Sequence, residues 1–223
     1  MKKRRFFALF LVLGLLVSLL SVPASAFEEL DVDARAALLV EKETGEILYE
    51  KNAHEKNYPA SITKLTVALL VFEAIDAGQL SLDQPISAHE SAFEGLSIYG
   101  STAGIKVGEV LTVEQLLQCM LIVSANEACN ILAEWDAGSI AAFVDAMNAK
   151  AKALGCENTH FVNPSGLHDP DHYTSAWDLY LITKAAMQYP EFMEICDSAK
   201  AVIPATNLSK ERTLYTTNHL LST

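Results

Sequence analysis

The sequence predicts a domain of the α/β (α+β) class, and three observations lead to this prediction. Two β-compatible runs surround a turn near the amino end, within residues 36–50. Apolar and amphipathic helical patterns occupy much of residues 61–187, and β-branched and turn residues dominate residues 201–223. The chain has 223 residues, of which 51% are hydrophobic, so it can form one domain with a substantial core.

Residues 1–26 have the pattern of a cleavable secretory signal peptide. The start MKKRR is basic, the run FFALFLVLGLLVSLL is apolar, and the small residues Ala24 to Ala26 resemble a cleavage site. The alternative is a retained membrane anchor, but the run is shorter than the roughly 20 residues that a spanning helix needs. We therefore expect an exported protein with a signal peptide at 1–26 and a domain at 27–223.

The charge of the chain argues against a nucleic-acid partner. Loss of the signal peptide would remove four positive charges and no acids, changing the formal net charge from −12 to −16. Phosphates would be repelled by such an acidic surface.

The cysteines and histidines give no metal-binding pattern. Four cysteines lie outside the signal peptide without a C-x-x-C pair, and the favoured interpretation is small apolar core residues, although export would permit disulfides. His168 and His172 are four residues apart, but Pro170 between them makes a helical ligand pair improbable. We expect no metal and no other cofactor. The cysteines are Cys119, Cys129, Cys156 and Cys196.

The first predicted elements are a hairpin and a buried helix. The runs 36–42 and 46–50 flank the turn residues Thr44 and Gly45, which is typical of a β-hairpin. A helix is expected from Ser61 to Ala77, closed by Gly78. This helix is apolar on nearly all sides, so we expect it at the centre of the fold.

Turns and short strands are expected over residues 80–110, and further helices follow. A capping box of Thr112 and Gln115 begins a helix that ends near Val123, which places Ser124 at the joint with the next helix. Another helix is expected over 140–154, and a last one, capped by Ser175 with Asp178, runs to residue 187. The tail has the composition of sheet edges rather than of helices.

Ser61 and Lys64 have the spacing of a nucleophile and its base. Residues i and i+3 share one face of a helix, so the hydroxyl and the amine can come within hydrogen-bonding distance. Desolvation beside the apolar helix lowers the pKa of a lysine toward the neutral form that accepts a proton. The structural alternative is an N-cap serine with a lysine whose stem reaches solvent, and an S-x-x-K match alone is weak evidence.

A second motif, Ser124-Ala125-Asn126, lies at the predicted helix joint. There a hydroxyl could relay a proton between a lysine and a leaving group, and the asparagine amide could bind a substrate carbonyl. Considered alone, S-x-N is more often a helix cap.

Together the two motifs resemble those of the penicillin-binding serine enzymes. The resemblance to the low-molecular-mass D-alanyl-D-alanine carboxypeptidases spans Leu30 to Thr223 and rests on three stretches in the same order. It implies a β-lactamase/transpeptidase-like fold, in which an antiparallel sheet packs with helices beside a mainly helical lobe. The stretches are AALLVEKETGEILYEKNAHEKNYPASITK, IKVGEVLTVEQLLQCMLIVSANEACNILAE and AKALGCENTHFVNPSGLHDPDHYTSAWDLYLITKAAM.

The resemblance implies a serine peptidase of the bacterial cell wall that removes the terminal D-alanine from peptidoglycan stem peptides and helps to maintain cell shape. Ser61 would be the nucleophile and Lys64 the base, while Ser124 and Asn126 would protonate the departing D-alanine and hold the substrate. The Ser61 amide would form part of the oxyanion hole. β-Lactams would acylate Ser61 covalently. Two further residues are assigned to substrate binding at the floor of the cleft, Gly166 and Leu167.

The chain differs from the family pattern in its third motif, K-T-G, which residues 1–223 do not contain. We therefore expect an incomplete catalytic domain that lacks the C-terminal strands and the segments by which such enzymes associate with the membrane. The alternative functions are an inactive module that binds peptidoglycan or penicillin and a class A β-lactamase. The loop ENTHFVNPSGL lacks the E-x-x-L-N setting that the β-lactamase would need.

Overall fold

The computed structural model describes residues 32–221, and the predicted signal peptide lies outside them. Contacts divide the chain into residues 1–34 and a compact unit, Arg35–Thr223, and all that follows concerns this second unit.

Six short strands form three antiparallel pairs. The predicted hairpin is confirmed: the Glu41 carboxylate accepts hydrogen bonds from the amide and the hydroxyl of Thr44, and Gly45 takes a positive φ of 75° in the turn. The tail, whose composition predicts sheet edges, forms an antiparallel strand pair followed by a short 3-10 turn. The pairs are β1 (Ala37–Val40) with β2 (Ile47–Lys51), β3 (Pro85–Ser87) with β4 (Val110–Thr112), and β5 (Lys200–Ile203) with β6 (Arg212–Tyr215).

Helices make up most of the regular secondary structure within residues 32–221. The predicted capping box at Thr112 and Gln115 is present with both of its hydrogen bonds. Ser175 caps a helix by accepting a hydrogen bond from the Asp178 amide, as expected. The helices are α2 (Lys64–Asp76), α3 (Val113–Ile122), α4 (Asn126–Ala137), α5 (Ile140–Ala153), α6 (Ala176–Ala186) and α7 (Pro190–Cys196), with 3-10 turns η1 (Ala60–Thr63), η2 (Glu90–Phe93) and η3 (His219–Leu221).

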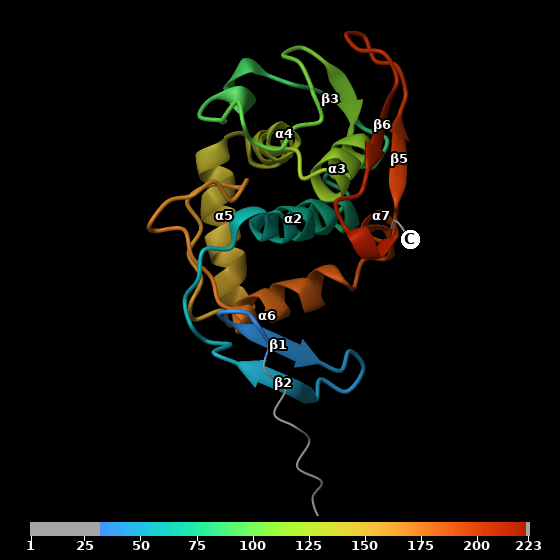
Figure 1. Cartoon of the computed structure of the whole chain (residues 1–223). Coiled ribbons are helices and arrows are strands. Elements are labelled where there is room, and N and C mark those ends of the chain that lie inside the picture. Colours follow the sequence, from blue (N-terminus) through green and yellow to red (C-terminus); the bar gives the residue numbers. More distant parts are fainter. Residues whose placement is uncertain (1–31, 222–223) are drawn as a thin grey trace, which may run out of the picture. The chain divides into compact units, whose positions relative to one another are not determined.

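Helix α2 lies at the centre, where it contacts α3, α4, α5 and α6 (Figure 1). Its apolar side chains, such as Val67 and Phe72, are almost fully buried because neighbours cover it on several sides. The helix ends as predicted: Gly78 adopts a positive φ of 70°, which allows the amide of Gln79 to bond the carbonyl of Ala74 at 2.9 Å.

Two predictions need correction, and one helix was not predicted. Ser61 was expected in the first turn of an α-helix, but a 3-10 turn covers Ala60–Thr63 and the α-helix begins at Lys64. The amphipathic helix α7 was not predicted; Pro190 at its start is suited to that position because the proline nitrogen needs no acceptor. Cys119 and Cys129 are buried as expected, but Cys196 is exposed, so the prediction of a core residue is wrong for Cys196.

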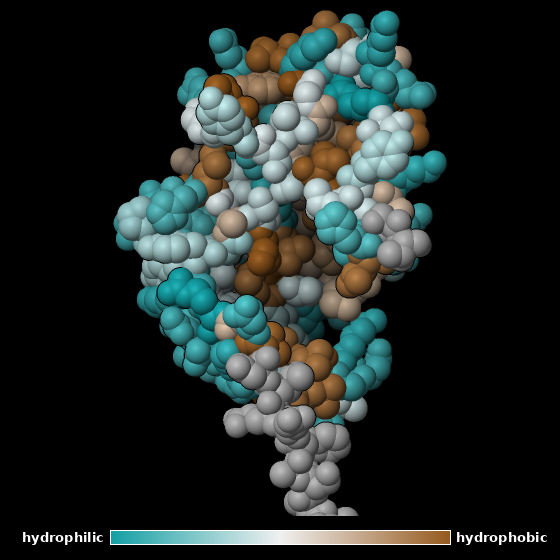
Figure 2. All heavy atoms as spheres, viewed as in Figure 1, coloured by the Kyte–Doolittle hydropathy of each residue, from teal (hydrophilic) through white to brown (hydrophobic). Residues whose placement is uncertain are grey.

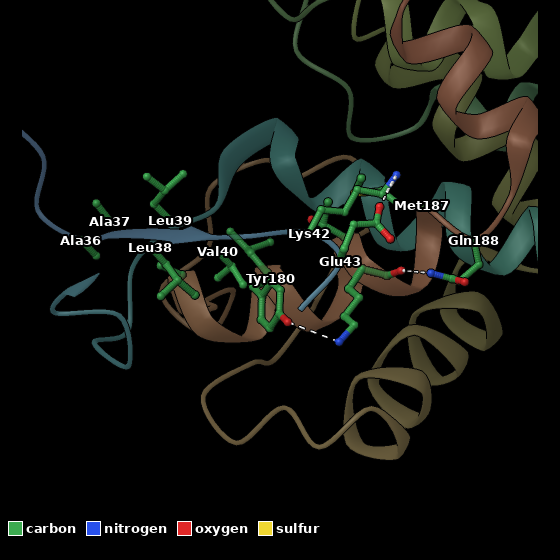
Figure 3. A pocket seen from close by; sticks show the side chains of 14 residues that line it. Ala36, Ala37, Leu38, Leu39, Val40, Lys42, Glu43, Tyr180, Met187 and Gln188 are labelled. Atoms are coloured by element: carbon green, nitrogen blue, oxygen red, sulfur yellow. Dashed lines mark hydrogen bonds and ion pairs between the residues drawn. The ribbon is translucent and has the colours of Figure 1, made fainter. Parts of the chain in front are cut away.

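A groove of about 880 Å³ lies between β1 and α6. Figure 3 shows Leu38 and Val40 of β1 together with Tyr180 and Met187 from the helical side, and Figure 2 shows hydrophobic atoms gathered in a hollow on this face of the molecule. Neither Ser61 nor Lys64 lines this groove, so the residues with the reactive pattern lie elsewhere.

Candidate active site

The 3-10 turn η1 presents Ser61 to solvent. Ala60 before it has a positive φ of 49°, a conformation that costs about 1 kcal/mol for a residue with a Cβ and must be held by its surroundings. A 3-10 turn places residues i and i+3 directly above each other, so Ser61 still faces Lys64 although the predicted α-helix is absent here. The Nζ atom of Lys64 lies 3.2 Å from Oγ of Ser61.

Lys64 is buried, with only 3% of its surface exposed, at the first position of α2. Its Nζ atom donates to Oδ1 of Asn126 at 2.8 Å and to the carbonyl of Ser165 at 2.7 Å, in addition to Ser61. Burial lowers the pKa of Lys64 below its usual 10.5, while the neighbouring Cys129 and Glu127 act weakly in the opposite direction. The amine is thus fully hydrogen-bonded and displaced toward its neutral form.

The joint between α3 and α4 carries the second motif. Ser124 has a positive φ of 60°, which turns the chain sharply, and the Ala125 amide bonds the carbonyl of Cys119. Asn126 then begins α4 with its Oδ1 toward Lys64, so its Nδ2 group is the donor that remains. Within residues 32–221, Oγ of Ser124 is buried and has no hydrogen-bond partner. An unpaired buried hydroxyl is costly and often marks a functional position.

The loop of residues 156–175, named the cleft-floor loop after the expectation above, contacts η1 and Lys64. A Cβ placed on Gly166 would lie 1.8 Å from the carbonyl oxygen of Ala60, so only glycine allows this approach. The side chain of Asn163 organises the bend: its Oδ1 accepts from the amides of Gly166 and Leu167, and its Nδ2 donates to the Leu167 carbonyl. Gly166 thus packs closely against the turn that carries Ser61.

Helices α5 and α6 hold this loop in place. The carboxylate of Asp178 accepts hydrogen bonds from the amide of Asn158 and the hydroxyl of Thr159, both at 2.7 Å. Asn148 of α5 exchanges two hydrogen bonds with the backbone of Phe161. These contacts stabilise the irregular backbone on which the Ser165 carbonyl is carried.

Glu127 anchors the opposite wall of the site. Its buried carboxylate accepts from the hydroxyl of Thr102 at 2.7 Å and from the amide of Ala103 at 2.8 Å, and the Asn126 amide bonds the carbonyl of Ser101. A cavity of about 260 Å³ is lined by Ser101 and Thr102 on one side and by Asn126 on the other.

Sequence reasoning brought together Ser61, Lys64 and Asn126, but it missed the supporting residues. Ser165 contributes only its backbone carbonyl, which no side-chain motif can indicate. Two signals in the sequence could have indicated the other supporting residues. They are the turn residues Asn163 to Gly166 and the acidic residue Glu127, directly after Asn126. Ser124 lies two residues before Asn126 in the chain, and Leu167 directly follows Gly166 in the loop.

Among residues 32–221, no group of three His, Cys, Asp or Glu side chains is arranged to hold a metal ion. None of the helices in that range is both long and apolar enough to cross a bilayer.

A model of the D-alanyl-D-alanine carboxypeptidase family matches residues 23–223. The chain belongs to this family. It is therefore a member of a group of serine peptidases that also includes penicillin-binding proteins, and the fold expected from the resemblance is confirmed.

This carboxypeptidase-family protein is similar in sequence to D-alanyl-D-alanine carboxypeptidases of several bacteria. It is 36% identical over 213 residues to the D-alanyl-D-alanine carboxypeptidase DacF of Bacillus subtilis, covering 92% of this chain and 54% of DacF. It is 36% identical over 157 residues to DacC of Escherichia coli, covering 69% of this chain and 39% of DacC. The chain thus spans about half the length, or less, of these relatives.

Solved structures agree with this membership. The D-alanyl-D-alanine carboxypeptidase DacD of Francisella tularensis aligns with a TM-score of 0.76 at 36% identity, over 83% of this chain and 44% of DacD. A D-alanyl-D-alanine carboxypeptidase of Mycobacterium tuberculosis aligns with a TM-score of 0.78 at 31% identity, over 90% of this chain and 72% of that one.

Proposed function

We propose that this protein is a serine-type D-alanyl-D-alanine carboxypeptidase that removes the terminal D-alanine from peptidoglycan stem peptides. The observation that carries the proposal is the position of the buried Lys64 amine, which contacts Ser61, Asn126 and the carbonyl of Ser165 at the same time. A serine hydroxyl beside a desolvated amine is the arrangement of an activated nucleophile.

In the acylation step, Oγ of Ser61 attacks the carbonyl carbon of the peptide bond between the last two D-alanines. Lys64, in its neutral form, accepts the hydroxyl proton as the new ester bond forms. The carbon–nitrogen bond then breaks, and the departing amine of D-alanine takes up a proton. The Ser61 amide, in the η1 turn, is a donor for the oxyanion, an interaction that contributes about 3 kcal/mol in serine peptidases.

Ser124 passes the proton from Lys64 to the departing D-alanine, a role suited to a buried hydroxyl without a partner among the described residues. Asn126 binds a carbonyl of the substrate through Nδ2, because its Oδ1 already accepts from Lys64. Water then hydrolyses the acyl-enzyme and regenerates Ser61. Gly166 and Leu167 line the floor of the cleft, with Gly166 also supporting the turn that carries the nucleophile.

The same serine would be acylated by β-lactams, whose strained amide mimics the scissile bond. The substrate lies in the cell wall, so the proposal places the protein outside the cytoplasm, consistent with the signal-peptide pattern of residues 1–26.

The test is to incubate the purified protein with a fluorescent penicillin and, separately, with a pentapeptide ending in D-Ala-D-Ala. We expect covalent labelling and D-alanine release, both abolished in Ser61→Ala. The fold should be unchanged, because Ser61 is exposed. The matched control is Ser81→Ala, another exposed serine, whose hydroxyl bonds Asp83 away from these residues. Labelling without release would indicate a binding module, and persistent labelling of Ser61→Ala would refute the nucleophile assignment.

A further inference from the structure

Thr63 and His172 connect the nucleophile turn to the cleft-floor loop. Thr63 lies between Ser61 and Lys64 in the chain, is fully buried, and has its Oγ1 atom 2.8 Å from Nε2 of His172. His172 is also buried, with 2% of its surface exposed. The contact joins residues 109 positions apart in the chain.

The hydrogen bond at Nδ1, the second ring nitrogen of His172, shows which of the two nitrogens carries the proton. The backbone amide of Val162 donates to Nδ1 at 3.1 Å, so Nδ1 must be the acceptor. The hydrogen therefore resides on Nε2, and the imidazole donates to the Thr63 hydroxyl. Burial lowers the pKa of His172 to about 4, with Asp169 acting to raise it and His160 to lower it, so the ring is neutral at neutral pH.

Two other contacts between the same segments lie beside this one. The Gly166 backbone packs against the carbonyl of Ala60 and lies close to the Thr63 hydroxyl, and the Ser165 carbonyl accepts from Lys64. The hydrogen bond from His172 to Thr63 adds a contact between two buried side chains, one from η1 and one from the loop.

We infer that His172 is a positioning residue for the acyl-transfer site: its neutral imidazole holds Thr63 and the cleft-floor loop together and so keeps the Lys64 amine enclosed against Ser165. This inference rests on the proposed function for its role in the reaction. In the contacts described above, His172 touches neither Ser61 nor the amine of Lys64.

The expected consequence of losing this contact follows from the cause of the Lys64 shift. Burial is the main reason that the pKa of Lys64 is lowered. If the loop moves away from η1, water reaches Nζ and replaces the Ser165 carbonyl as acceptor, so the pKa of Lys64 rises. A smaller fraction of the base is then neutral at a given pH, and the acid limb of the acylation rate moves to higher pH.

The experiment compares Thr63→Val, which keeps the shape but removes the acceptor, with Thr63→Ser, which keeps the hydroxyl. His172→Gln, whose amide can both accept from Val162 and donate to Thr63, tests rescue from the other side. His160→Gln is the control, because His160 lies in the same loop but is exposed. For each protein, the rate of acylation by a fluorescent penicillin is measured against pH, and the pKa of Lys64 is followed by the NMR signal of its side-chain carbon.

We expect Thr63→Val to slow acylation at neutral pH about tenfold and to shift both the acid limb and the Lys64 pKa upward by about one unit. Thr63→Ser, His172→Gln and His160→Gln should stay close to the unmodified protein. A thermal melt measures the stability of each variant. A variant that is only less stable keeps the pH midpoint of its acylation rate.

The inference is overturned if Thr63→Val, cooperatively folded, keeps the pH midpoint and the Lys64 pKa of the unmodified protein. It is also overturned if His160→Gln shifts them as much. The proposed function fails separately, when the unmodified protein is not labelled by penicillin; the Lys64 titration still tests the positioning role in that case.

Discussion

The backbone of Gly166 lies directly against the carbonyl group of Ala60, at a distance that no side chain would permit. A Cβ on Gly166 would come within 1.8 Å of the Ala60 oxygen, and Gly166 also has a positive φ of 83°. Ala60 itself has a positive φ of 49° and immediately precedes Ser61. A strained turn that carries Ser61 is thus held in place by a glycine more than a hundred residues later in the chain.

Substitution of this glycine should therefore displace Ser61, the proposed nucleophile. We expect Gly166→Ala to reduce penicillin acylation by about 10²-fold, because an error of about 1 Å in the position of a reacting group has an effect of this size. Stability should fall by about 2–4 kcal/mol from the clash and the backbone strain. Acylation kinetics and urea unfolding measure the two effects.

Gly155 offers a matched control for the backbone conformation. It has the same positive φ of 83°, but nothing lies within 4 Å of an added Cβ. Gly155→Ala should cost about 1 kcal/mol and leave acylation unchanged. Equal losses of acylation in the two variants would show that the contact with Ala60 is unimportant.

Removal of the proposed base should affect the chemistry far more than substrate binding. Lys64→Ala is expected to slow acylation about 10²- to 10⁴-fold, the usual contribution of a general base. In the unmodified protein, the acid limb of the pH profile should lie below 10.5, because burial lowers the pKa of Lys64. Stopped-flow labelling across pH measures both.

The control for this lysine is Lys150→Ala, which removes an ion pair with Glu73 on the α5 surface instead. Its acylation rate should not change. A rate for Lys64→Ala within a few-fold of normal would mean that Lys64 has a structural role only.

Ser124 should show opposite effects on activity and on stability. Its Oγ is buried without a partner among residues 32–221, so Ser124→Ala should leave stability unchanged or raise it by up to about 1 kcal/mol. D-Alanine release should nevertheless fall, because the proton relay to the leaving group is lost. Thermal unfolding and release of D-alanine from the pentapeptide provide the measurements.

Thr66 in α2 also has a buried hydroxyl without a partner among the described residues, and it serves as the comparison. Thr66→Val should affect stability in the same direction and leave release intact. If Ser124→Ala also releases D-alanine at the normal rate, the relay role is refuted.

The buried imidazole of His172 should make stability depend on pH. Its pKa is about 4 in the folded protein, against 6.5 in an unperturbed histidine, so the unfolded chain binds a proton that the folded one does not between these values. The contribution is fully present above pH 6.5 and is lost as pH falls toward 4, at about 1.4 kcal/mol per unit at most.

His172→Gln should flatten this part of the unfolding free-energy profile, measured by urea titration at several pH values. His160→Gln should retain most of the slope, because His160 contributes less than burial to the low pKa of His172. Parallel profiles for the unmodified protein and His172→Gln would contradict the low pKa of His172.

Local sequence patterns predicted the amino-terminal hairpin, the capping box at Thr112, the glycine that ends α2 and the central position of that helix. These features depend on near neighbours, whose hydrogen bonds and apolar periodicity are set within a few residues. The pattern missed the 3-10 turn at Ser61, because its strained backbone is stabilised by Gly166 and His172 of the distant cleft-floor loop.

The sequence by itself determined the family, the class of fold and the reactive residue types, because short motifs and their order along the chain carry that information. Only the tertiary structure decided the environment of Lys64: its burial, its contact with the Ser165 carbonyl and the orientation of Asn126 toward it. Desolvation and hydrogen bonding depend on atoms brought together from distant segments, so the chemistry of this lysine follows from the fold.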